Sequence, residues 1–123
     1  MPAELLHALL VEFAAFERDV MPPHQTPQKL LADLAAGWFG VVLLEQPDGT
    51  PMGFTAYSIN YSTFQGPAVY MIDLFVREEF RSAKRGGPRS DGTGGGSGGG
   101  HGKLLMQFCA RLTLECGCER LDW

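Results

Sequence analysis

Val69–Arg81 reads V-Y-M-I-D-L-F-V-R-E-E-F-R and Gly100–Leu105 reads G-H-G-K-L-L, and the rest of the chain is organised around these two stretches. The first is rich in β-branched and aromatic residues and almost continuously apolar, which is typical of a central strand buried on both faces. The second opens a helix with glycines. Unpaired backbone N–H groups and the positive end of the helix dipole meet at such a helix start. The pair therefore predicts a site for a phosphate group.

Length and charge limit the class of protein. The 123 residues predict one domain, 1–123, with a sizeable core. With 10 basic and 14 acidic residues the net charge is -4, which argues against a nucleic-acid partner. No apolar run is long enough to span a membrane, and Glu4 lies where an export signal would be basic, so we expect a cytoplasmic protein.

The sequence offers no recognisable metal site. Its cysteines and histidines are Cys109, Cys116, Cys118, His7, His24 and His101. They form no C-x-x-C pair and no zinc spacing, and the number of cysteines is odd. We therefore expect no metal, and reduced cysteines that act as small apolar residues.

The N-terminal part predicts two helices. Apolar residues at helical spacing indicate a first helix over Ala3–Asp19. Thr26 and Pro27 suit an N-cap and a first helical residue, so a short second helix is predicted over Gln28–Ala36, ending at Gly37.

A hairpin follows. Trp38–Glu45 and Gly53–Tyr61 have the character of strands, and Pro47–Gly49 is a turn between them. Ser62–Pro67 turns the chain again before the central strand.

The composition changes abruptly after Arg81. Ten of the 16 glycines lie in Gly86–Gly102, and no aliphatic or aromatic side chain larger than that of Ala83 occurs between Arg81 and His101. Such a segment cannot bury enough apolar surface to offset its ordering entropy. The sequence therefore predicts a disordered insert over Ser82 to about Gly99.

Regular structure is expected to resume at Lys103, in a helix that ends at Gly117, and Glu119–Trp123 begins a last strand. The predicted apolar face of this helix consists of Leu104, Leu105, Phe108, Cys109, Leu112 and Cys116. The element order α, α, β, β, β, α, β predicts an α/β fold.

The sequence contains no convincing glycine-rich motif for binding a nucleotide. Gly94–Gly99 matches G-x-G-x-x-G only because it is nearly all glycine. A P-loop fails because Ser97 replaces its first glycine and Leu104 replaces the residue that would bind magnesium.

Most of the chain resembles the GNAT N-acetyltransferases, and among them the spermidine/spermine (diamine) acetyltransferases. The stretches that carry the resemblance are L-L-V-E-F-A-A-F-E-R (9–18), G-F-T-A-Y-S-I-N-Y-S-T-F-Q-G (53–66), Y-M-I-D-L-F-V-R-E-E-F-R (70–81), G-H-G-K-L-L (100–105) and G-C-E-R-L-D-W (117–123). The resemblance implies a mixed central sheet flanked by helices, here truncated at both ends. It also implies direct acetyl transfer from acetyl-CoA to a primary amine such as a diamine, polyamine or lysine-like amine, and a homodimer as a possible assembly.

The resemblance also assigns roles to residues. For acetyl-CoA, the backbone of Leu74, Phe75 and Val76 would lie along the pantetheine arm, and Arg81, Gly100, His101, Gly102 and Lys103 would meet the pyrophosphate. For the amine, Phe16 and Glu17 would form one wall of the site and Asp122 and Trp123 the other. Asp73 would attract the cationic amine or take its proton.

Three departures from the family pattern accompany these roles. Ile72 stands where the polyamine enzymes carry a substrate-binding glutamate. The insert separates Arg81 from Gly100, although the family pattern R-x-x-G-x-G is continuous. The family's tyrosine general acid has no counterpart in the chain. Two alternatives therefore stay open: a non-catalytic protein that binds acyl-CoA or pairs with another subunit, and a truncated gene product.

Overall fold

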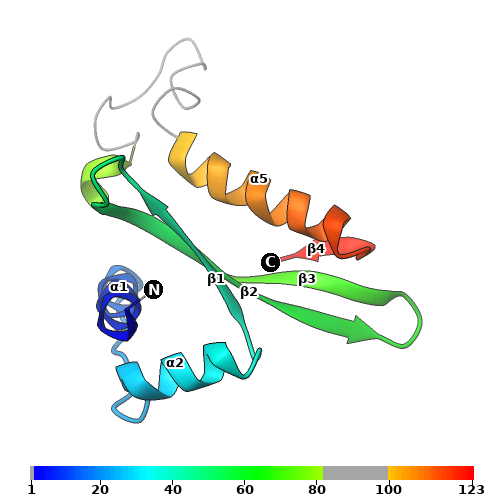
Figure 1. Cartoon of the computed structure of the whole chain (residues 1–123), viewed down its shortest axis with the longest axis horizontal. Helices are drawn as coiled ribbons and strands as arrows, with labels where there is room; N and C mark the ends of the chain where they lie inside the picture. Colours follow the sequence, from blue (N-terminus) through cyan, green and yellow to red (C-terminus); the bar gives the residue numbers. More distant parts are fainter. Residues whose placement is uncertain (1, 82–99) are drawn as a thin grey trace. The chain divides into compact units, whose positions relative to one another are not determined.

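The computed structural model describes residues 2–81 and 100–123. Contacts within the chain divide it into two compact units, Met1–Gly40 and Val41–Trp123, which are described in turn (Figure 1). The predicted insert at 82–99 lies outside the described residues. A single domain over 1–123 and a disordered insert therefore stay predictions.

The first unit consists of two helices that pack against each other, α1 (Ala3–Phe16) and α2 (Pro27–Ala35). Their buried residues are Leu6, Leu9 and Leu30. The predicted N-cap is confirmed, because the Thr26 side chain accepts a hydrogen bond from the Lys29 N–H at 3.1 Å and Pro27 begins α2.

Helix α1 is shorter than the predicted Ala3–Asp19. Arg18 has a φ of 58°, in the left-handed region, and this ends the helix. The N–H groups of Arg18 and Asp19 then donate to the carbonyls of Ala15 and Ala14, at 3.0 and 2.7 Å. These two bonds form a Schellman motif, which satisfies carbonyls that the helix leaves unpaired.

The second unit contains a mixed sheet in the order β1-β2-β3-β4. Its strands are β1 (Gly40–Glu45), β2 (Pro51–Ser62), β3 (Gly66–Val76) and β4 (Arg120–Asp122). Strands β2 and β3 are antiparallel, whereas β4 runs parallel to β3. The predicted turn between β1 and β2 is confirmed, with Gly49 at a φ of 91° and the Asp48 carboxylate accepting from the Thr50 N–H at 2.9 Å.

The central strand ends earlier than the sequence predicted. Strand β3 stops at Val76, and Glu78–Phe80 forms a short 3-10 helix, η1. Arg77, Glu78 and Glu79 follow Val76, and three successive charged residues do not suit a strand buried on both faces.

Helix α5 (Gly100–Glu115) packs against β2, β3 and β4, and Figure 1 shows it lying along one face of the sheet. It begins three residues before the predicted Lys103. Its buried residues are Leu105, Cys109 and Thr113, at positions i, i+4 and i+8. The predicted apolar face is therefore partly wrong, because Leu104, Phe108 and Cys116 are exposed.

The end of α5 follows the prediction. Gly117 has a φ of 71°, and its N–H donates to the Leu114 carbonyl at 3.2 Å, while the Cys118 N–H donates to Thr113 at 2.9 Å. This is a second Schellman motif, here with the glycine that such motifs favour.

Candidate functional site

One edge of β3 is only partly covered. Strand β4 pairs with β3 over Ala68–Tyr70, and residues 71–76 have no strand on that edge within the described part of the chain. The Arg77 N–H donates to Met52 in β2 at 2.7 Å. Because backbone groups of successive strand residues point to opposite edges, those of Val76 and Leu74 point to the open edge. An extended ligand is able to pair there as an added strand.

A β-bulge interrupts β3 within residues 71–76, whose edge is open. Asp73 pairs with Ala56, and Met71 pairs with the next residue, Tyr57, so Ile72 is the extra residue. Paired residues share a face of the sheet and successive residues alternate. The bulge therefore puts Asp73 and Met71 on opposite faces, although a regular strand would put them on the same face.

The first turn of α5 lies close to the open edge. A Cβ added to Gly102 would lie 3.9 Å from the Leu74 Cδ2 atom, whereas a Cβ on Gly100 would meet none of the described residues within 4 Å. The first four N–H groups of an α-helix have no partner within the helix. The described residues leave space beside Gly100, where an anion could approach these donors.

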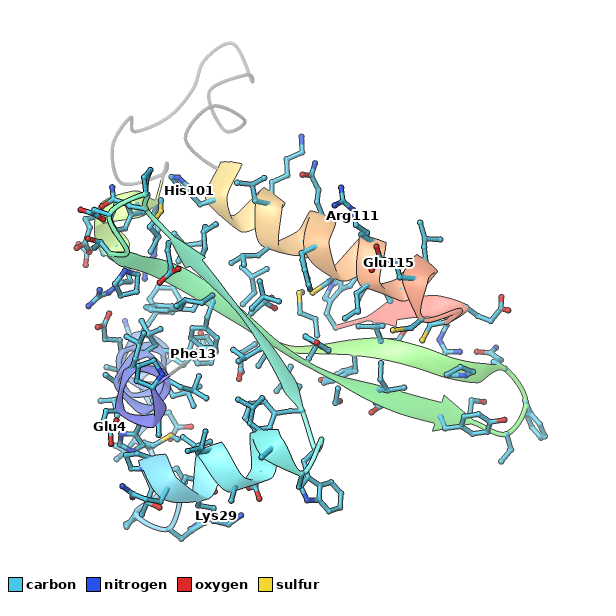
Figure 2. All side chains as sticks on the ribbon, in the orientation of Figure 1. Glu4, Phe13, Lys29, His101, Arg111 and Glu115 are labelled. Atoms are coloured by element: carbon cyan, nitrogen blue, oxygen red, sulfur yellow. The ribbon has the colours of Figure 1, made fainter. Side chains whose placement is uncertain are left out.

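The short helix η1 and the residue after it, Arg81, contact both elements of this site, α5 and β3. The His101 Nδ1 atom lies 2.9 Å from the Phe80 carbonyl oxygen, and the two rings meet edge to face at 6.2 Å. Arg81 Nε donates to the Val76 carbonyl at 2.6 Å, and its guanidinium lies 5.3 Å from the centre of the Phe75 ring. Figure 2 shows His101 at the beginning of α5, near η1.

The residues expected to bind acetyl-CoA thus lie together. They are Leu74, Phe75, Val76, Arg81, Gly100, His101, Gly102 and Lys103, and they come from the end of β3, the residue after η1 and the first turn of α5. Among them, the Arg81 guanidinium is already engaged by protein groups, whereas the Lys103 side chain is exposed.

The residues expected to bind the amine come from both units of the chain. Phe16 and Glu17 lie at the end of α1, in the first unit, and both are exposed. Asp122 lies in β4, where Arg120 Nη2 approaches its carboxylate at 3.3 Å. Trp123, the next residue, is 74% exposed.

Three features of the site were not expected from the sequence: the bulge at Ile72, the buried Thr55 hydroxyl, which donates to the Asp73 carbonyl, and the close approach of Gly53 to β3. Only Gly53 carried a signal, because a glycine within a strand often marks a close backbone contact. A bulge depends on pairing between strands and leaves no such mark in one strand's sequence.

Within residues 2–81 and 100–123, no three His, Cys, Asp or Glu side chains gather to form a metal site. No helix in the same ranges combines the length and the apolar character needed to cross a membrane.

The mixed four-stranded sheet and three α-helices of the described residues have the fold of the GNAT acetyltransferases. Among solved structures, a probable acetyltransferase is 17% identical with a TM-score of 0.76, covering 98% of this chain and 70% of that one. Glucosamine-6-phosphate N-acetyltransferase from Arabidopsis thaliana is 12% identical with a TM-score of 0.66, covering 98% of this chain and 76% of that one.

In sequence, the chain is similar to the thialysine N-epsilon-acetyltransferase of Caenorhabditis elegans, with 28% identity over 124 residues. The match covers 98% of this chain and spans 65% of the length of that relative. No family model matches the chain.

Proposed function

We propose that this chain is an acetyl-CoA-dependent N-acetyltransferase that acetylates a primary amine. The observation that carries the proposal is the meeting of the open edge of β3, at Leu74 and Val76, with the first turn of α5, at Gly102. A strand edge suits an amide-bearing pantetheine arm, and a helix start suits a pyrophosphate.

The groups present fit coenzyme A. The open edge offers backbone donors and acceptors to the amides of the pantetheine arm, although Arg81 occupies the Val76 carbonyl. The first-turn N–H groups of α5, with the exposed Lys103 ammonium, offer positive potential to the phosphates. Acetyl-CoA, when bound, supplies the thioester whose acetyl group passes to the amine nitrogen.

Asp73 is proposed to act on the amine. It lies at the bulge, directly before the Leu74–Val76 edge, and is half-buried. A carboxylate there attracts an ammonium group and accepts its proton, directly or through water, because only the neutral amine is a nucleophile. Direct transfer needs no covalent intermediate on the protein.

The acceptor is proposed to be a diamine, a polyamine or a lysine-like amine. The name of the nematode relative favours the last, since thialysine N-epsilon-acetyltransferase acts on an ε-amine by name. We propose that Phe16 and Glu17, at the end of α1, and Asp122 and Trp123, at the end of β4, contact this acceptor. A cytoplasmic homodimer remains part of the proposal.

Coenzyme A titration with a matched pair of variants tests the cofactor site. Lys103→Gln removes a cation from the first turn of α5, whereas Arg111→Gln removes an exposed cation further along the same helix, where Figure 2 labels it. The Lys103 variant should bind coenzyme A several-fold more weakly at low salt, and the Arg111 variant should bind like the wild type. Equal weakening by both would indicate a diffuse effect of charge and contradict the site.

Thiol release from acetyl-CoA tests the reaction. Putrescine, spermidine, lysine and thialysine serve as acceptors, and Asp73→Asn should lower kcat by about 10²–10⁴-fold with the preferred one. Coenzyme A binding without transfer to any amine would favour the non-catalytic acyl-CoA-binding alternative. Absence of coenzyme A binding would overturn the proposal.

A further inference from the structure

The buried hydroxyl of Thr55 is bonded to the bulged strand. Thr55 lies in the middle of β2 and is 0% exposed, and its Oγ1 donates to the Asp73 carbonyl oxygen at 2.8 Å. In the register of the two strands Thr55 is opposite Leu74, and the neighbouring pair is the last one before Ile72 interrupts the pairing. The hydrogen bond from Thr55 therefore contacts β3 at Asp73, where the regular pairing of β2 with β3 ends.

A second side chain supports the hydroxyl from α5. The Cys109 Sγ atom lies 3.9 Å from Thr55 Oγ1, and Cys109 is also 0% exposed. Burial raises the pKa of the Cys109 thiol, opposed by the hydrogen bond to Thr55, so the thiol keeps its proton at neutral pH. Either atom of the Cys109–Thr55 pair can be the donor. The bonds thus run from α5 through β2 to β3.

This arrangement favours the bulged register over a regular one. If the bulge were lost, the pairing on one side of it would shift by one residue and Asp73 would change faces relative to Met71. The Thr55 hydroxyl is fully buried and donates to the Asp73 carbonyl, so releasing Asp73 would leave a buried donor unsatisfied. The bond therefore opposes movement of Asp73 along the strand.

We propose that Thr55 is a positioning residue for the acetyl transfer, which holds the bulge at Ile72 and thereby the place of Asp73 beside the open edge. This inference rests on the proposed function for its catalytic part. The claim that Thr55 holds the bulge depends only on the geometry of β2 and β3. The structural and the catalytic effects of Thr55 are therefore measured separately.

Thr55→Val removes the hydroxyl and keeps the volume, and Thr55→Ser keeps the hydroxyl. Thr113→Val is the matched control, because Thr113 is also buried and its Oγ1 donates to a backbone carbonyl, that of Cys109, at 2.8 Å within α5. All three are made in the full chain. The first measurement is amide hydrogen exchange at Ile72 and Asp73 without ligand, relative to the slowest-exchanging amides of each variant.

The expected result is faster relative exchange at Ile72 and Asp73 in Thr55→Val, with wild-type exchange in Thr55→Ser and Thr113→Val. In the thiol-release assay, Thr55→Val should lower kcat by about 10–100-fold with little change in the KM for acetyl-CoA, and serine should restore it. If the valine variant does not fold, Thr55→Cys, a weaker donor of similar size, should give an intermediate change in both measurements.

Unchanged exchange at Ile72 and Asp73 in Thr55→Val would overturn the inference, whatever the activity. Faster exchange with an unchanged kcat would overturn the positioning role. A wild-type protein inactive with every amine would refute the proposed function instead, and the exchange measurement would still decide the role of Thr55 in the bulge.

Discussion

A Cβ atom added to Gly53 would lie 2.3 Å from the Phe75 carbonyl oxygen and 2.9 Å from the Val76 Cα. Both contacts are with backbone atoms, which a change of rotamer cannot move away. Strands β2 and β3 therefore approach each other too closely for any side chain at Gly53, at the end of β3 where the candidate site lies.

Gly53→Ala should accordingly destabilise the protein by about 1–3 kcal/mol or more, because the added methyl must push β3 aside. Gly102→Ala is the control, since its Cβ would make an ordinary contact with Leu74 at 3.9 Å. Urea unfolding of both variants checks this. A stability of Gly53→Ala within error of the wild type would mean that β2 and β3 leave room for a side chain at this position.

A substitution at Gly100 should affect stability and coenzyme A binding differently. Nothing in the described protein lies within 4 Å of a Cβ at this position. Gly100→Ala should therefore leave stability unchanged or raise it by up to about 1 kcal/mol, as alanine suits a helix better. If phosphates approach the first turn of α5 closely, the same methyl should weaken coenzyme A binding about tenfold or more. Calorimetric titration measures the affinity for coenzyme A. An unchanged affinity would mean that the phosphates do not bind beside Gly100.

A substitution at Arg18, which has a left-handed backbone conformation at the end of α1, should stabilise the protein. Arg18 occupies the position that glycine fills at the ends of α2 and α5, where Gly37 and Gly117 have φ values of 85° and 71°. Arg18→Gly should stabilise by up to about 1 kcal/mol, because relief of roughly 1–2 kcal/mol of strain exceeds the ~0.5–1 kcal/mol entropy cost of glycine.

The reverse changes provide the comparison. Gly37→Ala and Gly117→Ala should each destabilise by about 1 kcal/mol, since they place a Cβ in the same left-handed region. Urea midpoints of the three variants test the set. A loss of stability in Arg18→Gly would show that the arginine side chain contributes more than its backbone costs.

The buried thiol predicts a fall in stability at alkaline pH. The pKa of Cys109 is raised by burial, so above the ordinary thiol pKa of about 8.5 the unfolded chain releases this proton while the folded chain keeps it. The unfolded state then binds fewer protons, and the free energy of unfolding falls with pH, by at most about 1.4 kcal/mol per pH unit, until the folded pKa is reached.

Chemical denaturation between pH 7 and pH 10.5 measures this fall. Cys109→Ala should be less stable at pH 7 and should lack the cysteine contribution at higher pH. Cys116→Ala, which removes an exposed thiol, should retain the wild-type dependence. The same alkaline slope in Cys109→Ala and in the wild type would contradict a buried, protonated thiol.

The sequence alone determined most of the local structure and the order of the elements. The N-cap at Thr26, the turn at Gly49 and the helix end at Gly117 were predictable because each depends on neighbours within a few residues. The apolar stretch before Arg77 indicated a central strand for the same reason. The acetyl-CoA residues were named from a family resemblance, and their assembly from β3 and α5 agrees with that expectation without testing their roles.

Only the tertiary structure decided the details that make the candidate site. The bulge at Ile72 exists because two strands pair with a mismatch of one residue, and neither strand encodes that alone. The buried face of α5 passes through Thr113 and excludes Phe108, because contact with the sheet, and not hydrophobicity, selects the residues. The bond from Thr55 to Asp73 joins residues 18 apart in the chain, so it forms only once β2 and β3 are in register.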